Sequence, residues 1–226
     1  MTIRTIILTG ILATASCLSL ISLTGCSSAT IAAKEKIFGI AKRDQLVARV
    51  EDARESQVDA KKQFESALAE FLAVTGTQGK LGDIEAKYNK LKSATERSEA
   101  RAKAVSGRIE EVDTVAQKLF SEWKSELDLY NNANLRYAAE KQLADTKYQY
   151  SQLLAKMRAA ESKMQPVLKS LQDHTLFLKH HLNAAAIASL QGVSGEIQSE
   201  ISSLVKEMEA SINEATEFID QMQAGK

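Results

Sequence analysis

The sequence predicts an all-α fold, an elongated antiparallel four-helix bundle in which long helices pack as a coiled coil. Apolar residues recur at alternating spacings of four and three over most of the chain, which is the repeat of helices that supercoil around one another. The 226 residues include only one proline and ten glycines, too few turn-forming residues for a fold of many strands. Hydrophobic residues make up 44% of the chain and charged residues 26%, a composition that supports a buried core.

The first 26 residues have the character of a secretion signal. Arg4 precedes an apolar stretch that is too short for a membrane-spanning helix and ends in small residues. The tetrapeptide at its end, Leu23-Thr24-Gly25-Cys26, resembles the lipobox of bacterial lipoproteins. The resemblance implies cleavage between Gly25 and Cys26 and attachment of lipid to Cys26. We therefore expect a signal peptide over 1–25, a lipidated tether over 26–33 and the helical bundle over 34–226.

The lipoprotein resemblance also bears on location and on thiol chemistry. Several acyl chains on Cys26 would hold the protein durably to a membrane. The next residue, Ser27, is not the aspartate that retains Gram-negative lipoproteins in the inner membrane, so the resemblance implies the outer membrane, with the protein facing the periplasm. Cys17 leaves with the signal and Cys26 carries lipid, which leaves no thiol for a disulfide or a thiolate metal site.

Two apolar stripes predict the first two helices, over 31–74 and 82–130. Three glycines over residues 76–82 mark a turn where these segments meet, in which Gly76 suits the left-handed position after a helix and Asp83 suits the N-cap of the next. Only Gln57 is polar in the first stripe. The two stripes are Leu46, Val50, Ala53, Gln57, Ala60, Phe64, Ala67, Phe71 and Val74, and then Leu81, Ile84, Tyr88, Leu91, Thr95, Ser98, Ala102, Val105, Ile109, Val112, Ala116, Leu119 and Trp123.

The asparagine-rich segment Asn131–Asn134 predicts the second turn, because asparagine favours both helix stops and N-caps. The third helix, over 134–181, contains the only proline, Pro166, where we expect a kink and a change of phase in the apolar stripe. The third turn lies either near Asn183 or near Gly192 and Gly195. Helices of nearly equal length pack along their full extent, which favours Asn183 and a fourth helix over 183–223. The fourth stripe is Ile197, Ile201, Leu204, Met208, Ser211, Ala215, Phe218 and Met222.

The candidate side chains favour no catalytic, cofactor-binding or metal site, and no small-molecule substrate is indicated. The 29 basic and 29 acidic residues balance, which argues against nucleic-acid binding. His174, His180 and His181 lack the Glu-x-x-His spacing of metal sites in helical bundles. Gly79-Lys80 lacks the first glycine and the Ser or Thr of a phosphate-binding loop. The carboxylates alternate with basic residues, as on solvated helix faces, at positions that include Glu110, Glu111, Glu140 and Glu161.

Two segments leave functional alternatives open. Lys34, Lys36, Lys42 and Arg43 surround apolar residues shortly after the expected lipid. This helix start either rests on lipid headgroups or begins the bundle core with its lysines in solvent. The final residue, Lys226, resembles the C-terminal lysine through which the major outer-membrane lipoprotein of enteric bacteria is joined to peptidoglycan. A cell-wall tether is therefore an alternative role, and an unmodified C-terminal peptide from purified cell wall would refute it.

Several segments resemble an uncharacterised family of proteobacterial lipoproteins, namely Met164–Leu168, Leu176–Leu190, Glu122-Trp123 and the asparagine-rich turn. That family carries a domain of unknown function with long helical coiled coils, and it implies no activity. We expect a structural or protein-interaction role in the envelope, with another envelope protein or a second copy as partner. Partner binding predicts exposed apolar residues on one long face, such as Leu72, Phe120 and Leu129. An enzyme or metal-binding bundle is the remaining alternative.

Overall fold

The computed structural model describes the backbone of residues 27–76 and 81–224 and the side chains of residues 42–76 and 83–224. The described residues form four long helices and no strand, so the predicted all-α bundle is confirmed. The elements are α1 (Ser27–Thr75), α2 (Leu81–Glu126), a short 3-10 turn η1 (Leu127–Leu129), α3 (Ala133–His180) and α4 (Ala184–Ala224).

The chain divides into two compact units, Met1–Lys36 and Ile37–Lys226. In the first unit the structure describes only the beginning of α1, which starts at Ser27. The expected tether over 26–33 is therefore helical from Ser27 onward. The physical reason lies in its composition, because residues 27–33 include three alanines and neither glycine nor proline. Nowhere along the described helices is there a stretch long and apolar enough to cross a membrane.

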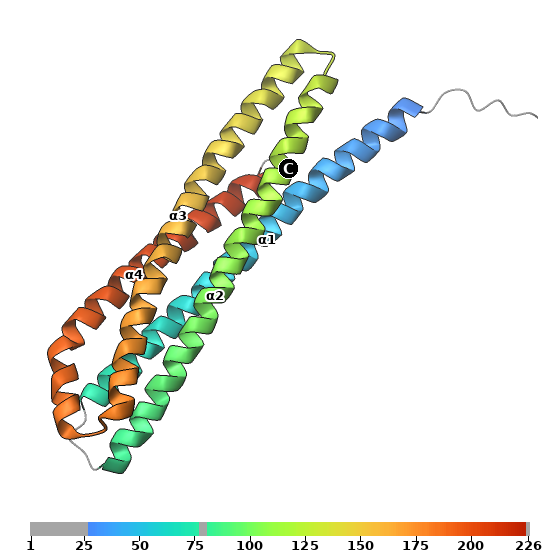
Figure 1. Cartoon of the computed structure of the whole chain (residues 1–226). Coiled ribbons are helices and arrows are strands. Elements are labelled where there is room, and N and C mark those ends of the chain that lie inside the picture. The colour runs from blue at the N-terminus through green and yellow to red at the C-terminus, as the bar shows by residue number, and fades with distance from the viewer. Residues whose placement is uncertain (1–26, 77–80, 225–226) are drawn as a thin grey trace, which may run out of the picture. The chain divides into compact units, whose positions relative to one another are not determined.

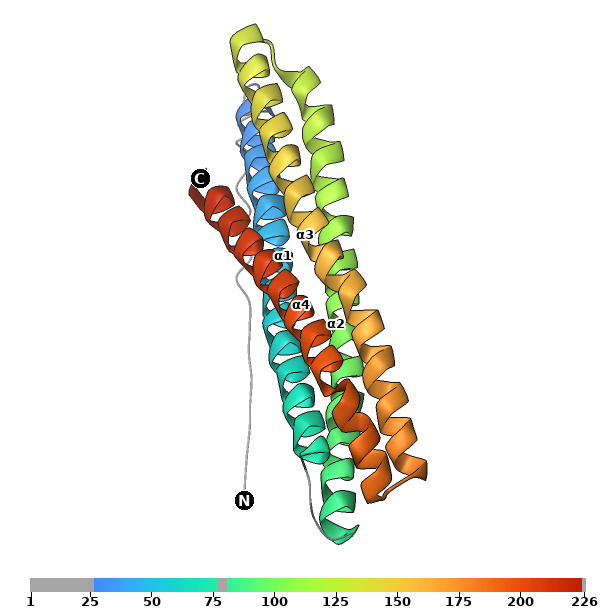
Figure 2. The same ribbon diagram turned by 90° about the vertical axis from the view of Figure 1, so that its left-hand side faces the viewer.

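The second unit, Ile37–Lys226, is an up-and-down bundle in which each helix packs against two others (Figures 1 and 2). Gln63 on α1 donates a hydrogen bond to the carbonyl of Ala94 on α2 (3.1 Å). On its other side α1 meets α4, where Lys61 lies 2.7 Å from Glu209. Because α3 packs against both α2 and α4, the four helices enclose a common core.

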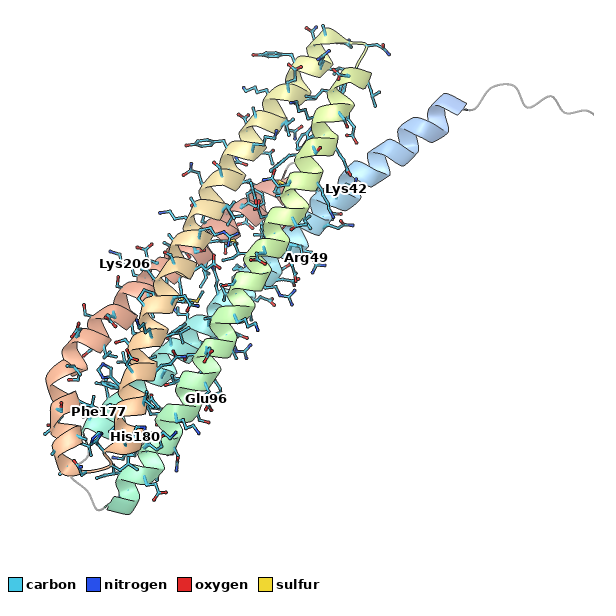
Figure 3. All side chains as sticks on the ribbon, in the orientation of Figure 1. Lys42, Arg49, Glu96, Phe177, His180 and Lys206 are labelled. Atoms are coloured by element: carbon cyan, nitrogen blue, oxygen red, sulfur yellow. The ribbon has the colours of Figure 1, made fainter. Side chains whose placement is uncertain are left out.

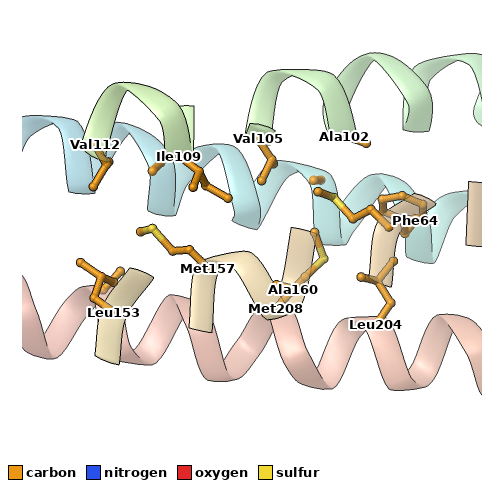
Figure 4. Packing of buried hydrophobic residues seen from close by; sticks show 14 of the residues in the cluster. Phe64, Ala102, Val105, Ile109, Val112, Leu153, Met157, Ala160, Leu204 and Met208 are labelled. Carbon is orange, nitrogen blue, oxygen red and sulfur yellow. The ribbon is translucent and has the colours of Figure 1, made fainter. Parts of the chain in front are cut away.

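The core is one continuous cluster of apolar side chains from all four helices. Figure 4 shows a section of it, in which Phe64 of α1, Ile109 of α2, Met157 of α3 and Met208 of α4 point inward. Every residue of the predicted α1, α2 and α4 stripes whose side chain is described is buried, except Trp123, which is partly exposed. Spacings of four and three thus identify the inward face of each helix correctly.

The first turn differs from the sequence prediction. The backbone of Gly76 lies outside the left-handed region, so the predicted left-handed stop is wrong. The last carbonyls of α1 are satisfied in another way: the Thr75 hydroxyl donates to the Phe71 carbonyl (3.2 Å), and Gln191 of α4 donates to the Thr75 carbonyl (2.6 Å). The second helix begins at Leu81, which places Asp83 in its first turn, where a negative charge suits the helix dipole.

Asparagines cap the next two helices. The Asn132 side chain accepts hydrogen bonds from the backbone N–H groups of Asn134 (2.9 Å) and Leu135 (3.2 Å) at the start of α3. The Asn183 side chain accepts one from Ala186 (2.9 Å) at the start of α4. The third turn therefore lies at Asn183, and the alternative at Gly192 falls inside α4.

The predicted change of phase at Pro166 is wrong. α3 runs through this residue from Ala133 to His180, and its buried stripe continues in step through Val167, Leu171 and Leu178. Pro166 and Ser162, whose carbonyl loses its usual partner, are both exposed, so water can solvate that carbonyl. Leu168 widens the stripe and accounts for the apparent shift in the sequence.

Candidate interaction surface

The predicted lipid-attachment and cell-wall residues lie outside the described part of the chain. These are the lipobox residues Leu23, Thr24, Gly25 and Cys26, and the C-terminal Lys226. The side chains of Lys34 and Lys36 lie outside it as well. Farther along α1, Lys42 pairs with Glu122 of α2, and the Arg43 guanidinium lies 5.8 Å from the centre of the Trp123 ring. These last two basic residues therefore contact α2, while the apolar side chains at 37, 38 and 40 lie outside the described part of the chain.

Most large apolar side chains that remain exposed gather near the two ends of the bundle. Figure 3 marks one end with Phe177 and His180 near the end of α3, and Lys42 lies toward the other. Among the described side chains, four exposed ones surround the α2–α3 turn, namely Leu129, Tyr130, Leu135 and Tyr137. Three lie where α1 and α3 end, namely Leu72, Leu176 and Phe177. Tyr148 lies along α3.

The predicted apolar face along the side of the bundle is therefore wrong. Phe120 is only 5% exposed, because its ring packs edge-on against Tyr150 of α3 at 5.4 Å. Leu72 and Leu129 are exposed, but they lie at opposite ends of the bundle. Contiguous exposed apolar residues mark interaction surfaces in soluble proteins, so the ends are the candidate surfaces.

The α2–α3 tip, which we define as residues 127–139, is a protruding hairpin end. In both views of the molecule α2 and α3 continue past the last turn of α4 (Figures 1 and 2). η1 buries Leu127 and leaves Leu129 exposed, and Tyr130 then takes an extended conformation. Asn132 is the N-cap of α3, and Ala139 in the first turns of this helix is buried. The local sequence thus closes the hairpin with few apolar residues inside and four outside.

The charges of the α2–α3 tip are few and paired. Asp128 and Arg136 are its only ionic residues, and their side chains lie 3.1 Å apart. Arg136 also lies 2.9 Å from Glu140, and this hydrogen bond is the main cause that raises the pKa of Arg136. The tip therefore presents leucine and tyrosine side chains around charges that are all paired.

The other end of the bundle, which we call the far end (Leu72, Leu176 and Phe177), lies beside the histidines. His174 packs against Phe71 with ring centres 5.7 Å apart, and His181 stacks on Phe177 at 5.0 Å. Within the region whose side chains are described, no three His, Cys, Asp or Glu residues converge as metal ligands. His174 and His181 thus serve the packing of aromatic rings at this end.

The carboxylates considered in the sequence are exposed or partly exposed, and three of the four form short-range ion pairs. Their partners are arginines of the same helix: Arg108 for Glu111 (2.9 Å), Arg136 for Glu140 (2.9 Å) and Arg158 for Glu161 (2.8 Å). A hollow of about 370 Å³ opens between α1 and α4, lined by Arg54, Glu55, Val58, Asp59, Ile212 and Thr216. Two of its charged residues are paired, since Asp59 lies 3.2 Å from Arg101 and Arg54 lies 3.5 Å from Glu51.

The most perturbed acid among the described residues is Tyr150 of α3, which has a structural role. Burial raises the pKa of Tyr150 far above its ordinary value of 10.0, and its hydrogen bond to Asp113 (2.7 Å) raises the pKa further. The ring lies between Phe120 of α2 and Phe218 of α4. A protonated hydroxyl held in an aromatic cluster thus joins three helices.

The core contains a polar pair of which the sequence singled out only one member. Gln57 of α1 accepts a 2.9 Å hydrogen bond from Ser211 of α4, and both residues are 0% exposed. Nε2 of Gln57 is buried without a hydrogen-bond partner. Gln57 stood out as the one polar residue of its stripe, but nothing in the sequence identified Ser211 as its partner.

Comparison with known families agrees with this architecture. A family described as Protein of unknown function (DUF2959) matches residues 31–222. The chain belongs to this family. The match to DUF2959 begins near the start of α1 and ends in the last turn of α4, so it covers the whole bundle. Neither the curated proteins nor the solved structures contain a match to the sequence.

Proposed function

We propose that this protein is a lipid-anchored structural component of the bacterial cell envelope. Cys26 carries the lipid, the bundle faces the periplasm from the outer membrane, and the chain has no catalytic activity. The anchor is supported by the tetrapeptide Leu23-Thr24-Gly25-Cys26, and the observation that carries the structural role is the placement of exposed apolar residues at the ends of the bundle. Helices of more than 40 residues are about 60–70 Å long, so a bundle with interactive ends suits a spacer.

The far end is the surface we assign to a protein partner in this scheme. It lies at the C-terminal ends of α1 and α3, whereas the anchor would enter at the N-terminal end of α1. Leu176 is 54% exposed and Phe177 is 38% exposed, and apolar and aromatic side chains of this kind anchor protein interfaces. A spacer with this polarity holds another envelope protein, or a second copy, at a set distance from the membrane.

A peptidoglycan link through Lys226 receives less support from the topology. α4 runs back from Asn183 toward the end of the bundle from which the α2–α3 tip projects, and it ends at Ala224. A cell-wall link at Lys226 would follow two residues after this end of α4, so most of the length of the bundle would not separate the cell wall from the membrane. We therefore keep the spacer as the proposed function.

The anchor is tested by comparing Cys26→Ala with Cys17→Ala in cells labelled with radioactive palmitate. We expect label in the wild type and in Cys17→Ala, because Cys17 leaves with the signal, and no label in Cys26→Ala. Intact mass should show a mature chain that begins with acylated Cys26. Equal labelling of Cys26→Ala would refute the anchor.

The partner surface is tested by crosslinking in intact cells followed by mass spectrometry. A photoreactive residue at position 176 should capture a defined protein, and the same residue at position 148 serves as the control. Tyr148 is 67% exposed on the side of α3, so it is accessible without belonging to the far end. Capture at both positions alike would contradict an end-on partner.

A further inference from the structure

We infer that the α2–α3 tip rests in the headgroup layer of the same membrane that holds the protein's lipid. The tip is then a second, non-covalent membrane contact, made by Leu129, Tyr130, Leu135 and Tyr137. This inference rests on the proposed lipid at Cys26, and it assigns the ligand of the tip as a phospholipid surface.

The first argument is the length of chain between the bundle and the anchor. Lys42 of α1 pairs with Glu122 of α2, so these residues lie at one level of the bundle. From that level α2 and η1 continue about 10 Å to Leu129. Since α1 is antiparallel to α2, it leaves Lys42 toward its own N-terminus on the side of the tip. Cys26 precedes Lys42 by only sixteen residues, so the proposed lipid is attached close in the sequence to this level of the bundle.

The second argument is the chemistry of the exposed side chains. Leu129 is 61%, Leu135 58% and Tyr137 70% exposed, unusual values for large apolar residues that cluster at one turn. Side chains on a helix lean toward its N-terminus, and α3 begins at the tip, so Leu135 and Tyr137 lean toward the end of the hairpin. Tyrosine, with an apolar ring and a polar hydroxyl, is enriched at the level of lipid headgroups.

The third argument is charge. Between Leu127 and Ala139 the only ionic residues are Asp128 and Arg136, which lie 3.1 Å apart, and Arg136 also pairs with Glu140 just beyond this segment at 2.9 Å. Paired charges lose less hydration free energy than isolated charges would when the tip enters the interface. Its remaining polar groups are asparagine side chains and tyrosine hydroxyls, which hydrogen-bond to water and headgroups alike.

The test uses the full lipidated protein with one added cysteine. Because Cys17 is removed with the signal and Cys26 is acylated, the mature chain has no other thiol. Leu135→Cys places a polarity-sensitive fluorophore on the tip. The matched control is Leu176→Cys at the far end, since the two leucines are 58% and 54% exposed. Both proteins are reconstituted in vesicles of phosphatidylethanolamine and phosphatidylglycerol, with and without nitroxide-bearing phospholipid.

We expect blue-shifted emission at position 135 and loss of about half of its intensity to the lipid nitroxide, with neither effect at position 176. Water-like emission at position 135 in protein that floats with the vesicles overturns the tip contact alone. A blue shift without lipid quenching also overturns it, because the tip then lies against protein, most simply a second copy. An intact mass without acyl groups overturns the proposed function together with this inference, so the two failures are distinguishable.

Discussion

At the scale of single residues, the Gln57–Ser211 pair is the least expected feature of the core. A glutamine at an otherwise apolar stripe position must bury an amide, and here only its carbonyl oxygen finds a partner. Buried polar groups at such positions in coiled coils set register at a cost in stability. We interpret the pair as a device that fixes the register of α1 against α4.

This interpretation predicts different results from removing either partner. Ser211→Ala should lower the free energy of unfolding by about 1–3 kcal/mol, since it leaves the whole Gln57 amide buried and unpaired. Gln57→Met should be neutral or stabilising, because it removes the unpartnered Nε2 and leaves a serine that can bond within its own helix. Urea unfolding followed by circular dichroism measures both.

Ser98→Ala is the matched control for the Gln57–Ser211 pair. Ser98 is also a serine that is 0% exposed, but the shorter of its hydrogen bonds lies within its own helix, to the Ala94 carbonyl at 2.9 Å, whereas its contact with the Gln63 carbonyl of α1 is long at 3.5 Å. Its replacement should change the free energy of unfolding by no more than about 0.5 kcal/mol. Equal losses for Ser98→Ala and Ser211→Ala would show that the Gln57–Ser211 hydrogen bond makes no particular contribution to the free energy of unfolding.

Tyr150 predicts a pH dependence of stability. Because burial and Asp113 raise its pKa in the folded state, the unfolded chain loses the Tyr150 proton first when the pH rises through 10.0. The stabilising contribution of Tyr150 is therefore complete below that pH and declines above it. Tyr150→Phe should cost about 1–2 kcal/mol near pH 8 and progressively less above pH 10. The exposed Tyr148→Phe is the control, and a Tyr150→Phe loss that is constant over this range would contradict the argument.

At the scale of helices, α4 contains two exposed glycines that its neighbours do not require. A Cβ added at Gly192 or at Gly195 would meet no atom within 4 Å. Gly192→Ala should therefore raise the free energy of unfolding by about 0.5–1 kcal/mol, because alanine loses less backbone entropy in a helix. Thermal unfolding measures the gain. Gly76→Ala is the control without a gain, since its Cβ would lie 3.2 Å from the Leu72 carbonyl oxygen.

The same experiment distinguishes the two turn positions that the sequence left open. If the chain turned at Gly192, alanine there would destabilise the protein. Asn183→Ala, by contrast, should cost about 1 kcal/mol, because it removes the side chain that accepts the hydrogen bond from Ala186. Opposite signs for the two substitutions are what a turn at Asn183 predicts.

The elements were predictable to the extent that their signals are local. Heptad spacing and asparagine caps act within one or two turns of chain, and they identified the buried faces of α1, α2 and α4, the asparagine-rich turn before α3 and the N-cap Asn183. The stop after Thr75 was not predictable, because Gln191 completes it from another helix. Phe120 was misread as exposed for the same reason: its cover, Tyr150, comes from α3.

The candidate surface was less accessible from the sequence than the fold. Which residues remain exposed at the α2–α3 tip depends on where α4 ends relative to α2 and α3, and that offset is a property of the assembled bundle. Leu135 and Tyr137 follow the N-cap Asn132, where sequence patterning gives no sign of burial or exposure. The proposed lipid site at Cys26, by contrast, can be predicted from the sequence alone, because its signal is a short motif that does not depend on the fold.

At the scale of the whole bundle, the continuous core predicts that residues 42–224 unfold together. One apolar cluster runs from Leu46 to Met222 with members on all four helices, so no part can lose its packing alone. Phe64 and Leu153 lie on different helices and are both 0% exposed. Phe64→Ala should lower the free energy of unfolding by about 3–5 kcal/mol, and Leu153→Ala should lower it by about 2–5 kcal/mol. Each should shift one urea transition without splitting it.

The single tryptophan makes this prediction testable near the tip. Trp123 lies where α1 meets α2, under Arg43, at the end of the bundle from which the hairpin projects. If that end belongs to the cooperative unit, Trp123 fluorescence and helical circular dichroism should follow the same urea curve in the wild type and in both variants. A fluorescence change that precedes loss of helix would mean that the Trp123 end opens separately. The tip would then lack the rigid support that a fixed membrane contact requires.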